Sequence, residues 1–211
     1  MVDRFPFAVR THQLKEEGGV AKGRDSGMPA ADQWEAFFDP DRLLDALVRE
    51  PLAGDVIEFG CGYGTFTIPA SRKTLGTVYA IDIDPVMIEA TRMRAAAARV
   101  NNVVVELKDF LEEGCGRESQ SMSMALLFNI LHIDDPVRLL QEACRVLRPG
   151  GMVAIIHWNH DARTPRGPPL EIRPRPEQCK RWGEEAGLSW LRHEALPGSP
   201  WHWGMLMARK A

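Results

Sequence analysis

VIEFGCGYGTF, at residues 56–66, is the stretch that decides the fold. It begins as a short apolar run, passes the acidic Glu58, turns through glycines and continues into a helix-compatible segment. A buried strand that feeds a glycine loop and a helix places a ligand over the edge of a sheet. Glycine suits such a turn because it adopts positive φ angles and leaves no Cβ in the path of a ligand.

The spacing of the glycines discriminates among ligands. A dinucleotide fingerprint reads G-x-G-x-x-G, whereas this loop reads Gly60-x-Gly62-x-Gly64, with Thr65 at the place of the third fingerprint glycine. The Gly-Lys-Ser/Thr of a Walker loop does not occur in it. The loop therefore suits an adenosine-bearing ligand without a pyrophosphate, or it is a tight strand–helix turn that holds no ligand.

Strands and helices alternate along the chain after this loop. Apolar runs predict strands at residues 77–81, 103–107, 122–128 and 152–156, and a final hairpin of strands at 189–195 and 202–208. The helix expected after Pro85 would bury an apolar face made of Val86, Ala90, Met93, Ala97 and Val100. The alternation predicts an α/β fold with a doubly wound, mostly parallel seven-stranded sheet, a C-terminal antiparallel strand and helices on both faces.

The composition of the chain argues against several classes of function. The chain has 211 residues and a net charge of −3, so no global basic field favours nucleic acid. We expect no signal peptide, and the apolar run at residues 122–133 is too short to span a bilayer. The four cysteines, Cys61, Cys115, Cys144 and Cys179, have neither zinc-site nor disulfide-framework spacing. These features predict a cytoplasmic protein without a metal.

The motifs together resemble the class I S-adenosylmethionine-dependent methyltransferases, whose first motif reads acidic-x-Gly-x-Gly-x-Gly after a strand. Residues 145–151, RVLRPGG, are similar to the stretch that precedes the fifth strand in that family. The resemblance covers residues 56–156, about half of the chain. It implies a Rossmann-like fold, S-adenosylmethionine as methyl donor, S-adenosylhomocysteine as product and an in-line displacement.

Asp82, at the end of the second strand and roughly 20 residues after the first loop glycine, can accept both ribose hydroxyls of an adenosine. Its alternative role is to cap the next helix, although Asp84 already suits that role. Glu58 either lies under the charged amino acid end of the donor or is a structural carboxylate that receives loop N–H groups.

The resemblance implies further donor contacts. An acidic residue after the third strand, here Asp109, accepts from the adenine amino group, unless it is a surface-turn aspartate. Phe110 or Ile83 would cover the ring, and Asn129 would lie against the methionyl part. The predicted donor site therefore consists of Glu58, Gly60, Cys61, Gly62, Tyr63, Gly64, Asp82, Ile83, Asp109, Phe110 and Asn129.

Acceptor residues are less well marked. His157 ends the fifth strand and is a candidate general base, a pocket-lining residue or a structural one. His132 is either a substrate contact or a helix-entry histidine. Trp158 would stack on the acceptor or cap the core, and the aromatic Trp34 and Phe38 are further candidate substrate contacts.

The predicted organisation has an N-terminal arm or lid at residues 1–40 and a single methyltransferase domain at 41–211, with a substrate-side loop at 156–176. We expect a small-molecule acceptor, no membrane, and a monomer or homodimer. The arginines of residues 163–181 would steer an anionic acceptor or lie in a solvated loop. Alternatives are methylation of RNA or protein, a nucleotide-dependent oxidoreductase, and a non-catalytic adenosyl-binding module.

Overall fold

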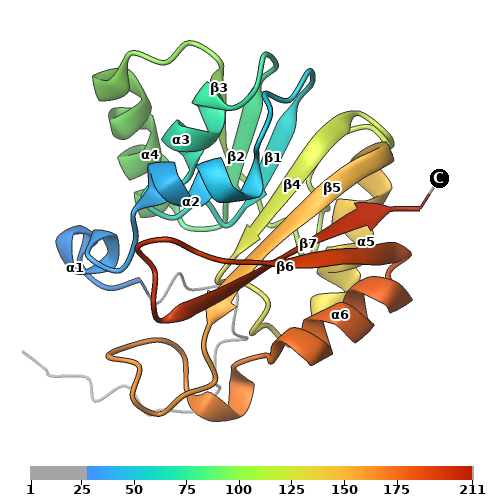
Figure 1. Cartoon of the computed structure of the whole chain (residues 1–211). Helices are drawn as coiled ribbons and strands as arrows, with labels where there is room; N and C mark the ends of the chain where they lie inside the picture. The colour runs from blue at the N-terminus through green and yellow to red at the C-terminus, as the bar shows by residue number, and fades with distance from the viewer. Residues whose placement is uncertain (1–27, 211) are drawn as a thin grey trace, which may run out of the picture.

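Strand β1 (Val56–Phe59) lies in the middle of the sheet, and all four of its residues are buried. It pairs in parallel with β2 (Val78–Asp82) and with β4 (Met122–Phe128). Figure 1 shows this arrangement in a computed structural model, which describes residues 28–210. The order of the seven strands is β3-β2-β1-β4-β5-β7-β6, as predicted for a mostly parallel, doubly wound sheet.

The other strands are β3 (Val103–Leu107), β5 (Leu147–Trp158), β6 (Leu188–Glu194) and β7 (His202–Arg209). Strand β7 runs antiparallel to both of its neighbours, β5 and β6, which confirms the predicted antiparallel strand. In the β5–β7 register, His157 is opposite Trp203 and Trp158 is opposite His202. The start of β7 therefore lies at the edge of the sheet where the parallel strands end.

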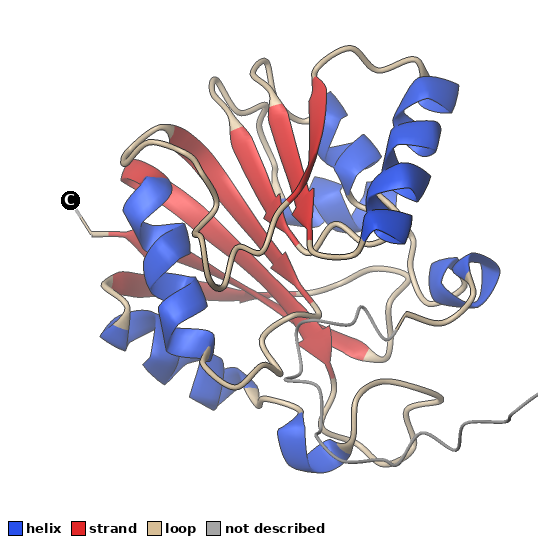
Figure 2. Cartoon of the chain, turned by 180° about the vertical axis from the view of Figure 1, so that it is seen from behind, coloured by secondary structure: helices blue, strands red, loops and turns tan. Residues whose placement is uncertain are grey.

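Helices cover both faces of the sheet (Figure 2). Those described are α1 (Ala31–Glu35), α2 (Pro40–Leu47), α3 (Thr67–Arg72), α4 (Pro85–Ala98), α5 (Pro136–Val146), α6 (Pro176–Glu185) and the short 3-10 helix η1 (Leu170–Ile172). Side chains of α1, α2 and α3 share one core cluster, and those of α5 and α6 share another. No helix within residues 28–210 is long and apolar enough to cross a membrane.

Three of these helices begin at Asp-Pro pairs. Asp39, Asp84 and Asp135 each accept a hydrogen bond from a backbone N–H of the first turn, and a proline follows each aspartate. The carboxylate satisfies an N–H that has no partner inside the helix, and the proline has no N–H to satisfy.

The predicted apolar face of α4 is wrong. Val86 is 65% exposed and Met93 is 64% exposed, whereas Met87, Ile88 and Thr91 are buried. The second half of the helix is mostly alanine, which gives almost no amphipathic signal. Thr91 faces inward because its hydroxyl donates to the carbonyl of Gly62, at 2.8 Å.

Strand β5 begins earlier than predicted. Helix α5 ends at Val146, and Leu147 pairs at once with Met122 of β4. Residues 148–151 form an irregularity in this pairing, where Gly150 has a φ of +73°. Helix α5 turns Leu139 and Leu140 inward, while Val137 and Cys144 are half-buried.

An aromatic cluster joins α1 to the end of the sheet. We use this name for Trp34, Phe37, Phe38, Phe66, Phe128, Trp158 and His202. The rings of Trp34 and Phe38 have centroids 4.8 Å apart, and those of Trp158 and His202 are 4.1 Å apart. The end of the predicted arm, residues 31–38, is thus packed into the core, and its earlier part, residues 1–27, lies outside the described residues.

This packing generates a stability prediction. Replacing Trp34 with alanine removes the ring that α1 buries in the aromatic cluster, so the free energy of unfolding should fall by about 3–5 kcal/mol. Trp190→Ala, at a half-exposed ring on β6, is the matched control and should cost less than about 1 kcal/mol. Urea unfolding of both variants measures the difference; equal losses would contradict this role of α1.

Candidate functional site

The glycine loop after β1 is held in a backbone conformation that requires glycine. Gly60, Gly62 and Gly64 have φ angles of +74°, +52° and +73°. A Cβ on Gly60 would lie 2.6 Å from Cδ1 of Ile130, and one on Gly64 would lie 3.0 Å from the side chain of Thr91. The loop therefore packs closely on the β4–α5 connection and on α4.

Asp82 connects this loop to the turn after β2. Its Oδ2 accepts from the N–H of Gly62 at 2.8 Å, and its Oδ1 accepts from the N–H of Asp84 at 3.0 Å. The side chain is buried, and burial raises the pKa of Asp82. The role of helix cap belongs to Asp84, whose carboxylate accepts from Val86 N–H at 2.8 Å. The backbone N–H of Ile83 also lowers the pKa of this carboxylate, which has about four acceptor sites and so can accept at least one further hydrogen bond.

Glu58 is buried beneath the glycine loop. The hydroxyl of Thr67, in the first turn of α3, donates to its carboxylate. Burial raises the pKa of Glu58 to about 8, the Thr67 hydrogen bond opposes the rise, and the nearby Asp82 carboxylate adds to it. A carboxyl group in such a position is largely neutral at pH 7, and a cation brought beside it would favour its charged form.

Residues before α1 lie over the same loop, which the sequence did not reveal. The hydroxyl of Tyr63 donates to the carbonyl of Pro29 at 2.8 Å. A Cβ on Gly62 would lie 3.2 Å from Cε of Met28. The segment that leads into α1 therefore covers part of the predicted donor loop.

The residues predicted to hold an adenine are close to β3 but differ in exposure. Asp109 is half-buried and accepts from the N–H of Glu112 at 3.2 Å, so its carboxylate also supports a turn. Phe110 is buried with its ring centroid 5.5 Å from that of Phe59. Ile83 is half-buried at the end of β2. Phe110 therefore packs in the core, and Asp109 and Ile83 are partly accessible at the edge.

Asn129, the first residue after β4, has an unusual backbone conformation. Its φ is +56°, which is uncommon for a residue other than glycine, and its N–H donates to the carbonyl of Ile156 at 2.8 Å. Both polar atoms of its side-chain amide are buried without a hydrogen-bond partner among the described residues. Strained backbone and unpaired buried polar atoms are typical of ligand-binding positions.

The predicted acceptor histidines contact each other. Nδ1 of His132 lies 3.2 Å from Nε2 of His157. His157 is completely buried, and burial lowers its pKa well below the usual value, with His132, His202 and Arg173 adding to the effect. His132 is half-buried. Of these two rings, only that of His132 reaches the molecular surface.

The three aromatic residues predicted to contact substrate lie in the aromatic cluster. Trp34, Phe38 and Trp158 are at most 9% exposed. His202 is buried among them, donates to or accepts from Ser199 Oγ at 2.9 Å, and has its pKa lowered to about 3, chiefly by burial. These rings pack against one another, and their roles as substrate contacts stay predictions.

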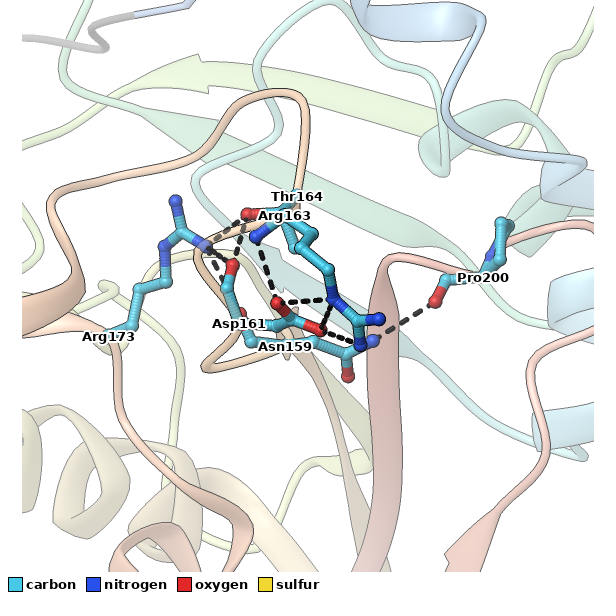
Figure 3. Close-up of polar contacts among 6 residues, drawn as sticks. All are labelled: Asn159, Asp161, Arg163, Thr164, Arg173 and Pro200. Atoms are coloured by element: carbon cyan, nitrogen blue, oxygen red, sulfur yellow. Dashed lines mark hydrogen bonds and ion pairs between the residues drawn. The ribbon is translucent and has the colours of Figure 1, made fainter.

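Arg173 organises the loop after β5, as Figure 3 shows. Its guanidinium donates to the carbonyls of Asn159, Asp161, Arg166 and Pro168 and to the hydroxyl of Thr164. Asn159 also binds the carbonyls of Pro200 and Trp201, which lie just before β7. Arg173 therefore uses its donors inside the loop, and Arg163 pairs with Asp161, so neither of these arginines is positioned to steer an acceptor.

Among residues 28–210, no group of three or more His, Cys, Asp or Glu is arranged to hold a metal ion. His160 lies apart from the other two histidines, with its Nδ1 3.2 Å from the carbonyl of Arg173.

The chain is similar in sequence and in fold to known methyltransferases. Residues 56–151, slightly less than half of the chain, match the model of a family described as a methyltransferase domain. The chain is 32% identical over 123 residues to aklanonic acid methyltransferase DauC from a Streptomyces species, covering 56% of this chain and 54% of that protein. It is 36% identical over 101 residues to the ribosomal protein L11 methyltransferase of Dechloromonas aromatica, covering 47% of this chain and 31% of that protein.

The chain thus spans about half or less of the length of these relatives. In three dimensions it is similar to the crystal structure of a SAM dependent methyltransferase from Aquifex aeolicus, with a TM-score of 0.72 and 23% identity. That likeness covers 82% of this chain and 90% of the other, and it shows the fold.

The buried Glu58 predicts a pH-dependent stability. Its pKa in the folded protein, about 8, lies above the ordinary value of 4.5, so the folded protein keeps a proton that the unfolded chain releases between these values. The free energy of unfolding of the wild type should therefore fall as pH rises from 4.5 to 8. Glu58→Gln, which does not titrate, should gain stability relative to wild type over this range and no more above it.

Urea unfolding at several pH values measures this difference. Glu89→Gln, at an exposed position on α4, is the matched control and should follow the wild type. Parallel stability curves for Glu58→Gln and wild type would show that Glu58 is ionised in the folded protein.

The hydrogen bonds of Arg173 predict how fast a protease cleaves the loop after β5. Arg173→Met removes the donors that hold four carbonyls, so trypsin should cleave the Arg166–Gly167 bond faster by about tenfold or more, while the sheet stays folded. Arg163→Ala, which removes only an exposed ion pair, should leave that rate within about twofold. Equal cleavage of the two variants after Arg166 would contradict the organising role of Arg173.

Proposed function

The chain belongs to the class I S-adenosylmethionine-dependent methyltransferases, and from this premise we propose that it transfers a methyl group from S-adenosylmethionine to a small-molecule acceptor. The transfer is an in-line displacement that leaves S-adenosylhomocysteine. The observation that carries the proposal is the link between Asp82 and the glycine loop, because it places a carboxylate beside backbone free of side chains.

The residues at this edge fit an adenosyl donor. Asp82 keeps acceptor capacity for the hydroxyls of a ribose, and Gly60, Gly62 and Gly64 leave room for close approach. Asn129 offers a side-chain amide whose two polar atoms are buried and lack partners in the described part of the chain. Asp109 and Ile83, at the ends of β3 and β2, are partly accessible for an adenine ring.

The bound donor supplies a methyl group on a sulfonium whose positive charge disappears as the methyl leaves. The protein's contribution is alignment and exclusion of water, since a near-attack geometry alone contributes much of the rate. Glu58 becomes charged when the ammonium group of the donor's amino acid end lies close to it, which offsets the burial that otherwise keeps it neutral.

A small-molecule acceptor is supported by one relative, whose name gives aklanonic acid as its substrate. The name of another gives ribosomal protein L11, so a protein acceptor is the alternative outcome. Against nucleic acid stands the net charge of −3. The residues after β4 read Asn129-Ile130-Leu131-His132, without the Pro-Pro-aromatic motif that some relatives use on base amino groups. Release of S-adenosylhomocysteine across panels of small molecules, proteins and RNA distinguishes the three classes.

We further propose a cytoplasmic location, in keeping with four free cysteines, of which Cys61, Cys115 and Cys179 are buried.

Two neighbouring aspartates test the donor site. Asp82→Ala should weaken binding of S-adenosylhomocysteine by at least about tenfold, because a ribose loses a bidentate acceptor of roughly 1.5–3 kcal/mol. Asp84→Ala removes the cap of α4 and should cost about 1 kcal/mol of stability while leaving the affinity within about twofold.

Isothermal titration calorimetry on the folded variants measures both affinities. Wild-type protein that binds no S-adenosylhomocysteine would contradict the proposed function, and an Asp82→Ala variant with unchanged affinity would contradict the ribose assignment alone.

A further inference from the structure

The carboxyl group of Glu58 is enclosed near the end of β1 without a cation beside it. The residue is 1% exposed, and the hydroxyl of Thr67 is its one hydrogen-bond donor among residues 28–210. Within that range no Lys or Arg forms an ion pair with it, and no N–H of the glycine loop donates to it. Because a buried carboxylate with a single partner is costly, the group holds its proton.

Two other titratable groups face Glu58. Asp82 lies at the end of the neighbouring strand β2, and Cys61 belongs to the glycine loop. The carboxylate of Asp82 accepts from three backbone N–H groups, which favour its charged form, whereas Glu58 has one hydroxyl. Burial and both carboxyl groups raise the pKa of the Cys61 thiol, which stays neutral. Two neighbouring carboxyl groups without a cation do not readily ionise together, so the proton belongs to Glu58.

Unpaired polar atoms lie at the same edge of the sheet. Three of the seven buried side-chain atoms without a partner in residues 28–210 are Oγ1 of Thr65 and the two polar atoms of the Asn129 amide. Thr65 follows β1 and Asn129 follows β4, and these strands are parallel neighbours (Figure 1). A Cβ on Gly60 would lie 2.6 Å from Ile130, so the two connections pack together. Buried polar atoms of this kind mark a place where polar groups of a ligand bind.

These groups match the two charges of an α-amino acid. A carboxylate accepts hydrogen bonds, which the hydroxyl of Thr65 and Nδ2 of Asn129 can donate. An ammonium donates hydrogen bonds, which Oδ1 of Asn129 and the carboxylate of Glu58, two residues before Gly60, can accept. A positive charge beside Glu58 lowers the pKa of its carboxyl group, so the arrival of the ammonium drives the proton out.

We propose that Glu58 makes the donor site selective for an amino acid end through proton exchange: adenosyl ligands with an ammonium bind with release of one proton, and those without it release none. This inference rests on the proposed function and adds a specificity-determining residue to it. The O–H bond of Glu58 breaks, its electron pair stays on the carboxylate, and the proton passes to solvent. By linkage, the affinity for ligands with an ammonium must then rise with pH while Glu58 of the free protein is protonated.

Isothermal titration calorimetry in buffers with different ionisation enthalpies counts the released protons. S-adenosylhomocysteine, which carries the ammonium, should release close to one proton at pH 7. Its affinity should rise by about tenfold or more between pH 6 and 7.5, below the pKa of about 8 that Glu58 has in the free protein. The probe 5′-methylthioadenosine has the same adenosine but no amino acid end. It should release no proton, and its affinity should stay within about twofold over this range.

Three variants locate the source of the proton. Glu58→Gln should bind S-adenosylhomocysteine without proton release and with an affinity that does not change between pH 6 and 7.5. Glu89→Gln, at an exposed position on α4, is the matched control and should follow the wild type. Thr67→Val removes the hydroxyl that favours the charged form of Glu58. At pH 8 this variant should therefore release close to one proton, whereas the wild type should release roughly half of one.

The outcomes separate this inference from the proposed function. If S-adenosylhomocysteine binds the wild type without releasing a proton, or if Glu58→Gln releases as many protons as the wild type, the inference is overturned although the donor site stands. Equal release with 5′-methylthioadenosine overturns it as well, because the proton would then come from the adenosine end. Failure of the wild type to bind S-adenosylhomocysteine rejects the proposed function instead.

Discussion

The carboxylate of Asp82 is the constraint on which the site depends. Because β1 and β2 are parallel neighbours, their carboxyl ends meet at one edge, and Asp82 there accepts N–H groups from Gly62 and Asp84. These two bonds fix the loop after β1 and the turn after β2 against each other. A buried carboxylate is costly unless it is hydrogen-bonded, so the position is maintained by the same groups that define the donor edge.

The proposed donor residues and the predicted acceptor residues come from two sets of elements. The region that matches the methyltransferase family, residues 56–151, holds the glycine loop, Asp82 and Asn129, which belong to the proposed donor site. The residues predicted to contact the acceptor come from this region and from elements on either side of it, which include α1 and the end of β5. The antiparallel direction of β7 is what brings Trp203 next to His157.

Local sequence signals predicted the fold. Apolar runs located the strands, and the pairs Asp39-Pro40, Asp84-Pro85 and Asp135-Pro136 located helix starts, because each signal acts within a few residues. The apolar face of α4 could not be found this way, since its burial is decided by a hydrogen bond between Thr91 and Gly62.

Long-range contacts explain what the sequence did not show on the acceptor side. His132 and His157 are 25 residues apart, and their contact depends on how the β4–α5 connection folds over β5. Arg173 reads as one more cation in a basic segment, and only the folded loop shows that it binds carbonyls. Burial likewise distinguishes the two histidines in a way that the sequence did not show, since His157 is completely buried and His132 is half-buried.

The most direct test of this account is a crystal structure of the protein with S-adenosylhomocysteine. We expect the ribose hydroxyls within hydrogen-bond distance of the Asp82 carboxylate, the adenosine over residues 60–64, and the amino acid end near Glu58 and Asn129. Ligand density away from the ends of β1 and β2, or no ligand at a concentration that saturates other methyltransferases, would contradict it.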